Sequence, residues 1–585
     1  MERIIPPAFD SLVLAAVARE IRQDLLDDRI TGLVQPDAYT VGLRLRTRRG
    51  TTGLLCSIHP RWARCVIAPL PEGRAVHPFA VQLRARLDGG RLRAAAVESF
   101  ERVLTLTCET LEGDVRLVLE VMGRHSNMLL VEGERVAGAF KTVTPAMSRV
   151  RPIAVGQRYT RPPRTRPTPA EVDTAALASW LAEGQPVGEA LVARFLGVSP
   201  PVAAHLALRA GLDPEQPAPP QAADALLAAV RELAATVSSG AFTPIWYEDE
   251  DGRPAAYAAI PLLSYRGLTE RAAASMSEAT VRVIETAARE AALAEQRQAL
   301  LARITDGMRR AERAAAEIEQ HLAATAEADR WRRFGELLLA YGSTVPPGAT
   351  EITVPDFDGT PISIPLDPRR SAVVNAQGYF RRHGKAAASR RTLPERLDAL
   401  RQERAYLDQM RVLAAQAATQ EELRMLRHEL GEAGVLRRRR TDRRARPAAA
   451  PAPRSFTTAT GLRIVVGRTS RENDYVTFTL AAPDDLWLHA RGMPGAHVIL
   501  KTDGRIPSPA DMETAAAVAA YFSQGRGAAS VPVDVTARRH VRKPKGARPG
   551  MVVYREERTL MVVPRLPDAA ANGERPRKGS RAWDR

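Results

Sequence analysis

The chain has 585 residues, a length that predicts roughly three to five domains. Its formal charge is +17 and its hydrophobic content is 45%, which is enough to bury ordinary cores. Only six of the 84 basic residues are lysines, so 78 are arginines, which bind phosphate through a planar fork and stack on bases. This excess favours a polyanion, most simply nucleic acid, as partner. Drift in an arginine-favouring composition is the alternative.

The cysteines and the apolar runs exclude several protein classes. Cys56, Cys65 and Cys108 are too few and too badly spaced for a four-thiolate zinc site or a disulfide framework. No run approaches the roughly 18 apolar residues of a membrane span. Asp10 and Ser11 precede the first apolar stretch as cap candidates, which predicts an amphipathic helix and not a signal peptide. We therefore expect a cytoplasmic protein with no membrane partner.

Period-two patterning dominates residues 39–140, with turn signals between segments such as TVGLRLRT and VRLVLEVM. A helical stretch, PFAVQLRARL, interrupts the strands at residues 78–87. The pattern predicts an α+β domain over residues 1–165. Its last part, within the Pro-rich, basic segment 151–170, is expected to be a linker.

Residues 171–240 are predicted to form short Ala/Leu helices. Within them, FLGVSPPVAAHLALRAGL places a Gly-containing hairpin between two helical runs. A helix–hairpin–helix module of this kind offers backbone N–H groups to phosphate. A plain helical packing module fits the same residues equally well.

Helical periodicity dominates residues 270–436 and predicts an antiparallel coiled-coil hairpin. The first arm, of roughly 50 to 60 residues, would reach on the order of 75–90 Å. The second arm is expected from Pro394 to Glu432, with Leu397, Leu400, Leu407 and Met410 on its apolar face. The apolar seam of the first arm consists of Leu301, Ile304, Met308, Ala311, Ala315, Ile318, Leu322 and Thr325.

The segment between the two arms is expected to cap the hairpin. EITVPDFDGTPISIPLD is strand-like, and SAVVNAQGYFRRHGKA follows it. A rod of this form either reaches a distant partner or serves as a structural spacer.

The remaining chain is predicted to form a linker, one domain and a tail. Residues 437–454 are basic and then Pro/Ala-rich, which is typical of a disordered linker. The domain at 455–566 is expected to contain strands at LRIVVGR and YVTFTL, a helix from Asp511 to Gln524, and further strands in MVVYREERTLMVVP. Residues 567–585 are expected to be disordered.

Residues 120–131, EVMGRHSNMLLV, place His125 beside Ser126 and raise the question of a nucleophile and its base. Such a pair needs side chains within hydrogen-bond reach and an oxyanion hole. Neighbours on a strand point to opposite faces, and the Gly-x-Ser-x-Gly elbow is not present here. Arg124, Ser126 and Asn127 instead supply donors for phosphate, ribose or base edges. We therefore predict recognition here and no catalytic residues.

Two stretches of the last domain carry polar clusters. In DLWLHARGMPGAHVILK, His489, Arg491, His497 and Lys501 surround a Gly/Pro turn, but His-x7-His without nearby carboxylates is poor for zinc, so no metal is expected. TARRHVRKPKGARPG, residues 536–550, has six basic residues and no acid, whereas a solvated structural face normally mixes signs. The predicted phosphate contacts of this stretch are Arg538, Arg539, Arg542, Lys543 and Lys545.

Four stretches resemble the signature segments of the NFACT family, and the resemblance covers about residues 3–565. It implies an N-terminal NFACT domain with a glycosylase-like fold, a helix–hairpin–helix module, a coiled-coil middle domain and an NFACT RNA-binding domain. The stretches are EVMGRHSNMLLV, IPLDPRRSAVVNAQGYFRRHGKA, RTSRENDYVTFTLAAPDDLWLHARGMPGAHVILK and PVDVTARRHVRKPKGARPGMVVYREERTLMVVP.

The resemblance implies a function in ribosome-associated quality control. Members of the family bind a large ribosomal subunit that still carries peptidyl-tRNA with a stalled nascent chain, and they recruit tRNA to it. In the bacterial RqcH-like members, which this chain resembles most, alanyl-tRNA is delivered without mRNA and an alanine tail marks the nascent chain for degradation. The implied partners are large-subunit rRNA and ribosomal proteins and alanine tRNA. No cofactor is implied, and the ribosome forms the peptide bond.

The resemblance also assigns residues. The family's functional Asp-Arg pair aligns with Glu101 and Arg102 at the start of a strand, where Arg102 matches and Glu101 is longer by one methylene. The Arg-His-Ser-Asn run matches fully at residues 124–127, and Arg542, Lys543 and Lys545 match in the basic stretch. By resemblance, the N-terminal residues contact tRNA and the coiled coil anchors to the ribosome.

Two other functions remain as alternatives. A fibronectin-binding surface adhesin is suggested by an older label within the family, but the arginine excess and the predicted lack of a signal peptide disfavour it. A nucleic-acid enzyme is suggested by similarity to formamidopyrimidine-DNA glycosylases. Those enzymes attack with an N-terminal proline amine that is exposed when the initiator methionine is removed, and most carry a four-Cys zinc finger. This chain begins Met-Glu-Arg and has three scattered cysteines.

Overall fold

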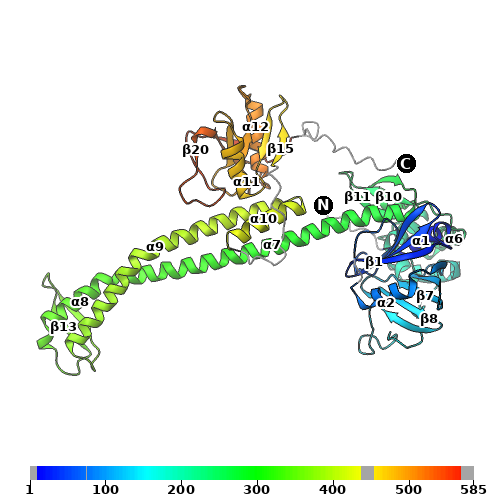
Figure 1. The fold of residues 1–585 in the computed structure, drawn as a ribbon, viewed down its shortest axis with the longest axis horizontal. Helices are drawn as coiled ribbons and strands as arrows, with labels where there is room; N and C mark the ends of the chain where they lie inside the picture. Colours follow the sequence, from blue (N-terminus) through cyan, green and yellow to red (C-terminus); the bar gives the residue numbers. More distant parts are fainter. Residues whose placement is uncertain (1–8, 74–75, 436–452, 568–585) are drawn as a thin grey trace. The chain divides into compact units, whose positions relative to one another are not determined.

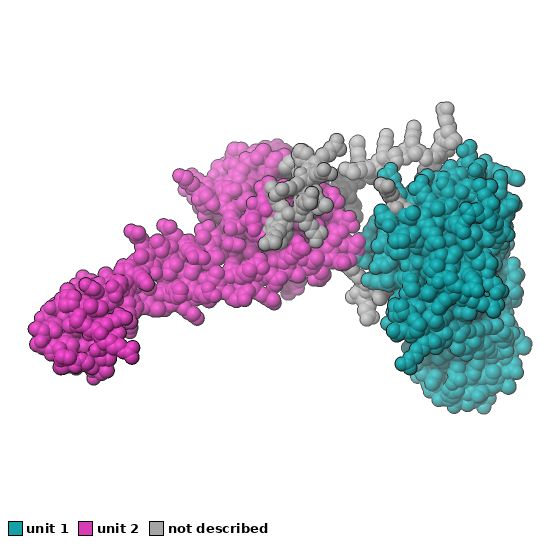
Figure 2. All heavy atoms as spheres, turned by 60° about the horizontal axis from the view of Figure 1, so that its bottom comes forward, with its two compact units in different colours: residues 1–291 teal, residues 292–585 magenta. Residues whose placement is uncertain are grey.

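The computed structural model describes residues 9–73, 76–435 and 453–567. The chain divides into two compact units, residues 1–291 and 292–585 (Figures 1 and 2). Most of the predicted linker at 437–454 and almost all of the predicted tail at 567–585 lie outside the described residues. Within the described parts, no helix is long and apolar enough to cross a bilayer.

The first helix of unit 1, α1 (Ser11–Asp24), confirms the predicted amphipathic helix. Asp10 caps it, because its side chain accepts a hydrogen bond from the backbone N–H of Val13 at 3.0 Å. Apolar residues from Leu12 to Ile21 on α1 are buried in the main core of the unit.

Unit 1 is built around a nine-stranded antiparallel sheet in the order β4-β3-β2-β1-β5-β6-β7-β8-β9 (Figure 1). Helix α2 (Pro78–Leu87) interrupts the strands where predicted. One strand, β1, precedes the predicted start of the sheet, because its Gly32 and Pro36 break the sequence pattern. The strands are β1 Arg29–Asp37, β2 Thr40–Thr47, β3 Gly50–Ser57, β4 Arg64–Ile67, β5 Arg91–Val97, β6 Val103–Thr110, β7 Gly113–Glu120, β8 Asn127–Glu132 and β9 Arg135–Ala139.

The segment predicted as a linker packs on this sheet in its first half. Ile153 is buried with the apolar side chains of β6 to β9, and it pairs with Val143. Glu120 is almost fully buried, and its carboxylate accepts hydrogen bonds from Arg151 at 2.5 and 2.9 Å and from the Tyr159 hydroxyl at 3.1 Å. The linker prediction is therefore wrong for residues 151–159, since a buried charge needs these partners.

Four helices follow, as predicted for residues 171–240, and then a small sheet that the sequence did not reveal. The sheet, in the order β11-β10-β12, comprises β10 Ile245–Glu248, β11 Pro254–Ala258 and β12 Thr269–Ala272. Strands of four or five residues carry too little periodicity to be recognised in isolation. The helices are α3 Thr174–Leu181, α4 Val187–Arg194, α5 Pro200–Arg209 and α6 Ala223–Ser239.

Two long helices make up most of the first part of unit 2, and the first of them begins within unit 1. Helix α7 (Met276–Ala324) has 49 residues, or roughly 75 Å, and α9 (Ala372–Gln416) has 45. Between them lie α8 (Ala328–Ala340) and a hairpin of β13 (Glu351–Pro355) and β14 (Pro361–Pro365), which the strand-like sequence predicted.

The two long helices run antiparallel. Arg404 contacts Glu312 at 2.6 Å and Arg401 contacts Glu319 at 2.9 Å. Residue numbers therefore rise along one helix while those of their partners fall along the other. On α7, Ile304, Ala311 and Ile318 are buried at seven-residue intervals along the predicted seam. The supercoiling of a coiled coil stays a prediction.

The predicted second arm is wrong at both ends. Helix α9 begins at Ala372, so the SAVVNAQGYFRRHGKA segment is helical and Pro394 lies inside the helix. Ala376 and Tyr379 pack in a small core with α8, and Ala386 and Leu397 are buried on either side of Pro394, so tertiary contacts flank the proline. The helix ends at Gln416, and a new helix, α10 (Gln420–Glu432), starts from a Thr419 cap.

The last domain is a six-stranded sheet in the order β15-β16-β18-β17-β19-β22, with α12 (Pro509–Tyr521) sharing the core of one face. The α9 helix contacts this domain, since the backbone N–H of Gly495 donates to Gln409 at 3.0 Å. A short pair, β20 Val541–Arg542 with β21 Val553–Tyr554, follows β19. The strands of the main sheet are β15 Arg454–Thr457, β16 Arg463–Val466, β17 Leu486–Ala490, β18 Val498–Leu500, β19 Val531–Ala537 and β22 Arg558–Val562.

The strand predicted at YVTFTL is wrong. This segment belongs to a short helix, α11 (Ser470–Tyr475), and the π-helical turn Val476–Leu480 that follows it. The Thr469 hydroxyl accepts from the backbone N–H of Glu472 at 3.1 Å and so starts a helix where β-branched residues favour a strand. Val476 is then buried against Trp487 in a core on the other face of the sheet.

The buried His497 predicts a pH dependence of this domain's stability. Burial lowers the pKa of His497 to about 3, whereas the unfolded side chain titrates near its ordinary value of 6.5. Below pH 6.5 the unfolded state binds the extra proton and the folded state does not, so stability falls as the pH falls, by up to about 1.4 kcal/mol per pH unit, until about pH 3. Urea unfolding followed by hydrogen exchange of the β17 and β18 peptides measures this slope. His497→Gln is expected to flatten it, and an unchanged slope would contradict the assignment.

Candidate nucleic-acid interface

The loop between β5 and β6 carries Glu101 and Arg102 and is held by the helical module. Phe100 is 2% exposed and adopts a φ of +63°, a left-handed conformation that is costly for an aromatic residue. Gly197, between α4 and α5, lies directly against it, because a Cβ added there would come within 2.0 Å of the Phe100 carbonyl oxygen. The hairpin glycine of the predicted helix–hairpin–helix therefore supports this loop.

Arg102 is half-buried immediately before β6. Burial lowers the pKa of its guanidinium, and the charge of Asp10 opposes that shift. The Asp10 carboxylate is itself used by the N–H of Val13 at 3.0 Å and by the Ser199 hydroxyl at 2.7 Å. Among the described residues, the Arg102 guanidinium makes no hydrogen bond or ion pair. A partly desolvated cation of this kind is suited to an anionic or carbonyl ligand.

Two contacts place the neighbours of Arg102. The backbone N–H of Glu101 donates to the carbonyl of Glu98 at 3.0 Å, which closes the loop and leaves the Glu101 side chain half-buried. The carbonyl of Arg102 accepts from the N–H of Val121 at 2.9 Å. The end of β7 therefore fixes the backbone of Arg102.

The Arg-His-Ser-Asn run divides into an exposed half and a buried half. Arg124 and His125 lie in an exposed 3-10 turn, where the Arg124 Nε donates to the His125 Nε2 at 3.0 Å. Ser126 is 0% exposed, and its hydroxyl accepts from the N–H of Met122 at 2.8 Å. Asn127 is also buried. The strand predicted through residues 124–126 is wrong, since β8 begins only at Asn127.

Hydrogen bonds occupy the buried half of the run. The Asn127 Oδ1 accepts from the N–H groups of Met128 at 3.0 Å and Lys141 at 2.9 Å, and its Nδ2 donates to the Lys141 carbonyl at 2.8 Å. Ser126 and Asn127 therefore hold the turn together, and their contact with RNA stays a prediction. The Ser126 hydroxyl lies in the interior, which disfavours it as a nucleophile activated by the exposed His125.

Three predicted RNA contacts of the last domain face inward or are half-buried. His497 is 1% exposed, and its Nδ1 lies 2.9 Å from the Thr477 hydroxyl. The Lys501 ammonium is 2.5 Å from the buried Asp485 carboxylate. His497 and Lys501 therefore have structural partners inside the domain, and their contact with RNA stays a prediction. His489 is half-buried, and burial lowers its pKa, which favours a neutral ring at neutral pH.

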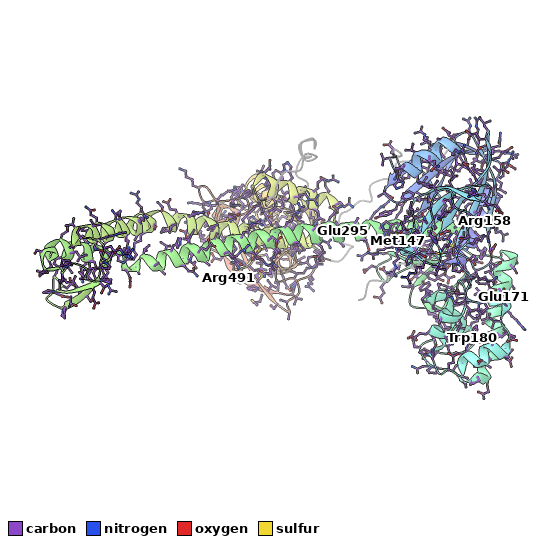
Figure 3. The ribbon with its side chains drawn as sticks, turned by 90° about the horizontal axis from the view of Figure 1, so that it is seen from below. Met147, Arg158, Glu171, Trp180, Glu295 and Arg491 are labelled. Carbon is purple, nitrogen blue, oxygen red and sulfur yellow. The ribbon has the colours of Figure 1, made fainter. Side chains whose placement is uncertain are left out.

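The arginines that follow β17 and β19 differ in how accessible they are to a ligand. Arg491 is exposed at the end of β17, where its Nη1 donates to the Thr559 hydroxyl at 2.8 Å (Figure 3). Arg538 is half-buried and donates to the Thr477 carbonyl at 2.9 Å, so it holds the π-helical turn, and its contact with RNA stays a prediction. Arg539 is exposed and pairs with Asp484.

The basic stretch presents its other cations outward. Arg542 and Lys545 are exposed, and within the described residues neither makes a hydrogen bond or an ion pair. Lys543 pairs with Asp474, whose carboxylate also accepts from the N–H of Gly550 at 3.0 Å. Asp474 therefore holds the stretch while Arg542 and Lys545 face solvent, as phosphate ligands would.

The structure adds Asp10 to the surroundings of Arg102, which the sequence did not predict. Asp10 was predicted only as a helix cap, yet its charge acts on Arg102, which is 92 positions away in the chain. No local pattern signals a contact across such a separation. Among the described residues, no group of three or more His, Cys, Asp and Glu side chains could hold a metal ion.

Comparisons with known proteins match two family models. The model of the NFACT N-terminal and middle domains matches residues 10–449, and that of the NFACT protein RNA binding domain matches residues 454–547. Among curated relatives, the Rqc2 homolog RqcH of Bacillus subtilis is 30% identical over 95% of this chain and 98% of its own. That of Streptococcus pneumoniae is 27% identical over the same shares.

Solved structures of two parts of one protein also match. They are the C-terminal and N-terminal parts of the fibronectin/fibrinogen-binding protein from Streptococcus suis. The first is 28% identical, with a TM-score of 0.36, over 47% of this chain and 95% of that one. The second is 23% identical, with a TM-score of 0.39, over 48% and 100%. With family models matching most of its length, this chain belongs to the NFACT family.

Proposed function

We propose that the chain is a ribosome-associated quality control factor that binds a large ribosomal subunit carrying a stalled nascent chain and recruits tRNA to it. The observation that carries the proposal is its similarity to Rqc2 homologs RqcH along 95% of its length. Delivered alanyl-tRNA would extend the nascent chain by an alanine tail without mRNA, and the tail would mark that chain for degradation.

The features of each unit support the proposal separately. In unit 1, Arg102 is a partly desolvated cation without a partner among the described residues, which suits contact with a tRNA phosphate or base edge. In unit 2, Arg542 and Lys545 face solvent on the domain that matches the RNA-binding model. The long α7–α9 pair is proposed to reach the ribosome. Peptide-bond formation is left to the ribosome, and this chain acts by binding.

The proposal predicts which RNAs accompany the protein. Affinity purification from cells followed by RNA sequencing is expected to enrich large-subunit rRNA and alanine tRNA over small-subunit rRNA and other tRNAs. An untagged strain provides the background. Absence of that enrichment, or fractionation that finds most of the protein on the cell exterior as expected for an adhesin, would overturn the proposal.

Arg102→Ala is expected to abolish alanine tailing while large-subunit binding stays near the wild-type level, because the change removes a ligand contact and not the ribosome contacts of unit 2. Tails are measured by mass spectrometry of nascent chains, and binding is measured by co-sedimentation with large subunits. Arg102→Lys keeps the charge but loses the fork and should retain only part of the activity. The exposed Arg158→Ala is the control, and tails that persist unchanged in Arg102→Ala would remove Arg102 from the site.

The exposed cations of the basic stretch are expected to contribute to the salt dependence of RNA binding. Each lost phosphate contact lowers the slope of log K against log salt by roughly 0.7 to 0.9. The Arg542→Ala/Lys545→Ala double variant should therefore reduce the slope by about 1.5, measured by filter binding of rRNA fragments from low to moderate salt. Arg565→Ala, which removes an exposed arginine near Glu513, is the matched control. A double variant with the wild-type slope would exclude these two contacts.

A further inference from the structure

Three aromatic rings and an arginine gather at one edge of the nine-stranded sheet, outside the residues discussed so far. Tyr39 lies in the turn before β2, and His59, Arg61 and Trp62 lie in the connection from β3 to β4. The Tyr39 and His59 rings meet edge to face with centroids 5.1 Å apart, and the His59 and Trp62 rings are near parallel at 6.3 Å. The Arg61 guanidinium lies 5.2 Å from the Trp62 ring centre. We call these four residues the aromatic platform.

Hydrogen bonds hold the aromatic platform in place. The His59 Nδ1 accepts from the N–H groups of Arg61 and Trp62, both at 3.2 Å, and the Trp62 carbonyl accepts from Arg64 at 3.0 Å. The N–H of Tyr39 donates to the Asp37 carboxylate at 2.7 Å. Burial lowers the pKa of His59, which agrees with a neutral ring whose Nδ1 is an acceptor. These bonds fix the His59 ring and the backbone that carries the other three side chains.

The surface of the aromatic platform combines exposed ring area with positive charge. Tyr39 is 37% exposed, and the Arg61 side chain faces solvent. Asp37 is the acid whose charge acts on His59, while Arg61, Arg64 and Lys141 act on it with positive charge. Positive charge beside exposed aromatic rings matches the two parts of a nucleotide, its phosphate and its base.

The aromatic platform adjoins the turn that carries Arg124 and His125. A Cβ added to Gly123, which opens this turn, would lie 3.7 Å from the carbonyl oxygen of Pro60. The same turn follows Val121, whose N–H donates to the carbonyl of Arg102. The aromatic platform and Arg102 are therefore connected through the end of one strand, β7.

The chemistry favours unpaired nucleotides over a duplex. In a duplex, base faces are covered by their neighbours, so exposed rings have nothing to stack on except an end. Unpaired bases can stack on aromatic side chains and on arginine planes, and this contact tolerates many sequences. A protein partner would be better served by a broad apolar patch, whereas here basic groups surround a few rings.

We propose that the aromatic platform binds an unpaired nucleotide of an RNA partner by stacking on Tyr39, with Arg61 and the Gly123–His125 turn holding adjacent phosphates. The proposal rests on the RNA-binding role proposed above and narrows it: the N-terminal unit grips a single-stranded stretch of the RNA, such as a loop. Trp62 and His59 support the stack from behind and keep its geometry.

The test compares two RNAs of equal charge. Full-length protein is titrated with a short single-stranded RNA and with the same oligomer made abasic at its central positions, and binding is followed by fluorescence anisotropy. Wild-type protein is expected to prefer the base-bearing oligomer by about fivefold, the low end of stacking effects per base. Tyr39→Ser should bring the ratio of affinities close to one, while Tyr39→Phe, which keeps the ring, should preserve the ratio.

Further measurements separate stacking from its alternatives. Phe357→Ser, at an exposed aromatic residue of unit 2, is the control and should leave the ratio unchanged. A Tyr39→Ser ratio equal to wild type, a wild-type protein that does not distinguish the oligomers, or equal loss of both oligomers would overturn the proposal. A photo-cross-linker at position 39 that captures polypeptide and no RNA would assign the surface to a protein and overturn it as well.

Co-sedimentation with large ribosomal subunits distinguishes this inference from the proposed function. If wild-type protein co-sediments and tails nascent chains but the oligomer ratio is insensitive to Tyr39, only the aromatic platform is wrong. If wild-type protein neither co-sediments nor enriches tRNA, the proposed function fails, whatever the oligomers show.

Discussion

The close approach of Gly197 to the carbonyl of Phe100 is the contact on which the N-terminal site depends. A side chain at position 197 would meet that oxygen at 2.0 Å, so only glycine allows the helical module to sit against the β5–β6 loop. The loop in turn holds Phe100 in a left-handed conformation and places Arg102 immediately before the first residue of β6. Burial, together with the charge of Asp10, then defines the electrostatic state of Arg102. The hairpin thus acts as a support for the loop.

Burial divides the polar residues of this family's signature segments into two classes. Ser126 and Asn127 carry the hydrogen bonds of a turn, and His497 lies in the interior of the last domain. Their neighbours Arg124 and Arg542 face solvent. A signature segment therefore contains both exposed groups, which are open to a ligand, and buried groups, which shape the backbone under them. Changes in the buried class are also expected to be harmful, because a buried polar atom that loses its hydrogen-bond partner lowers the stability of the fold.

The features of unit 1 that we propose to contact RNA join at the end of β7. The N–H of Val121 holds the backbone of Arg102, the turn after it presents Arg124 and His125, and Gly123 lies beside the connection that carries the aromatic platform. A strand end in an antiparallel sheet is well suited to this, because its ladder of hydrogen bonds fixes one side while the turn beyond it stays open to a partner. The candidate RNA-binding residues thus lie on backbone that hydrogen bonds of the sheet hold in place.

The sequence by itself determined the α+β class, the helix at 78–87, the first amphipathic helix and the basic character of the last domain, because periodicity, caps and charge are local properties. Tertiary structure decided the conformation of segments where local propensities favour a different one. Thr469 and packing against Trp487 make YVTFTL helical despite its β-branched residues. Helix α9 continues through Pro394, with Ala386 and Leu397 buried on either side of it. It also decided which polar residues are exposed, since burial depends on segments that are distant in the chain and that no local pattern encodes.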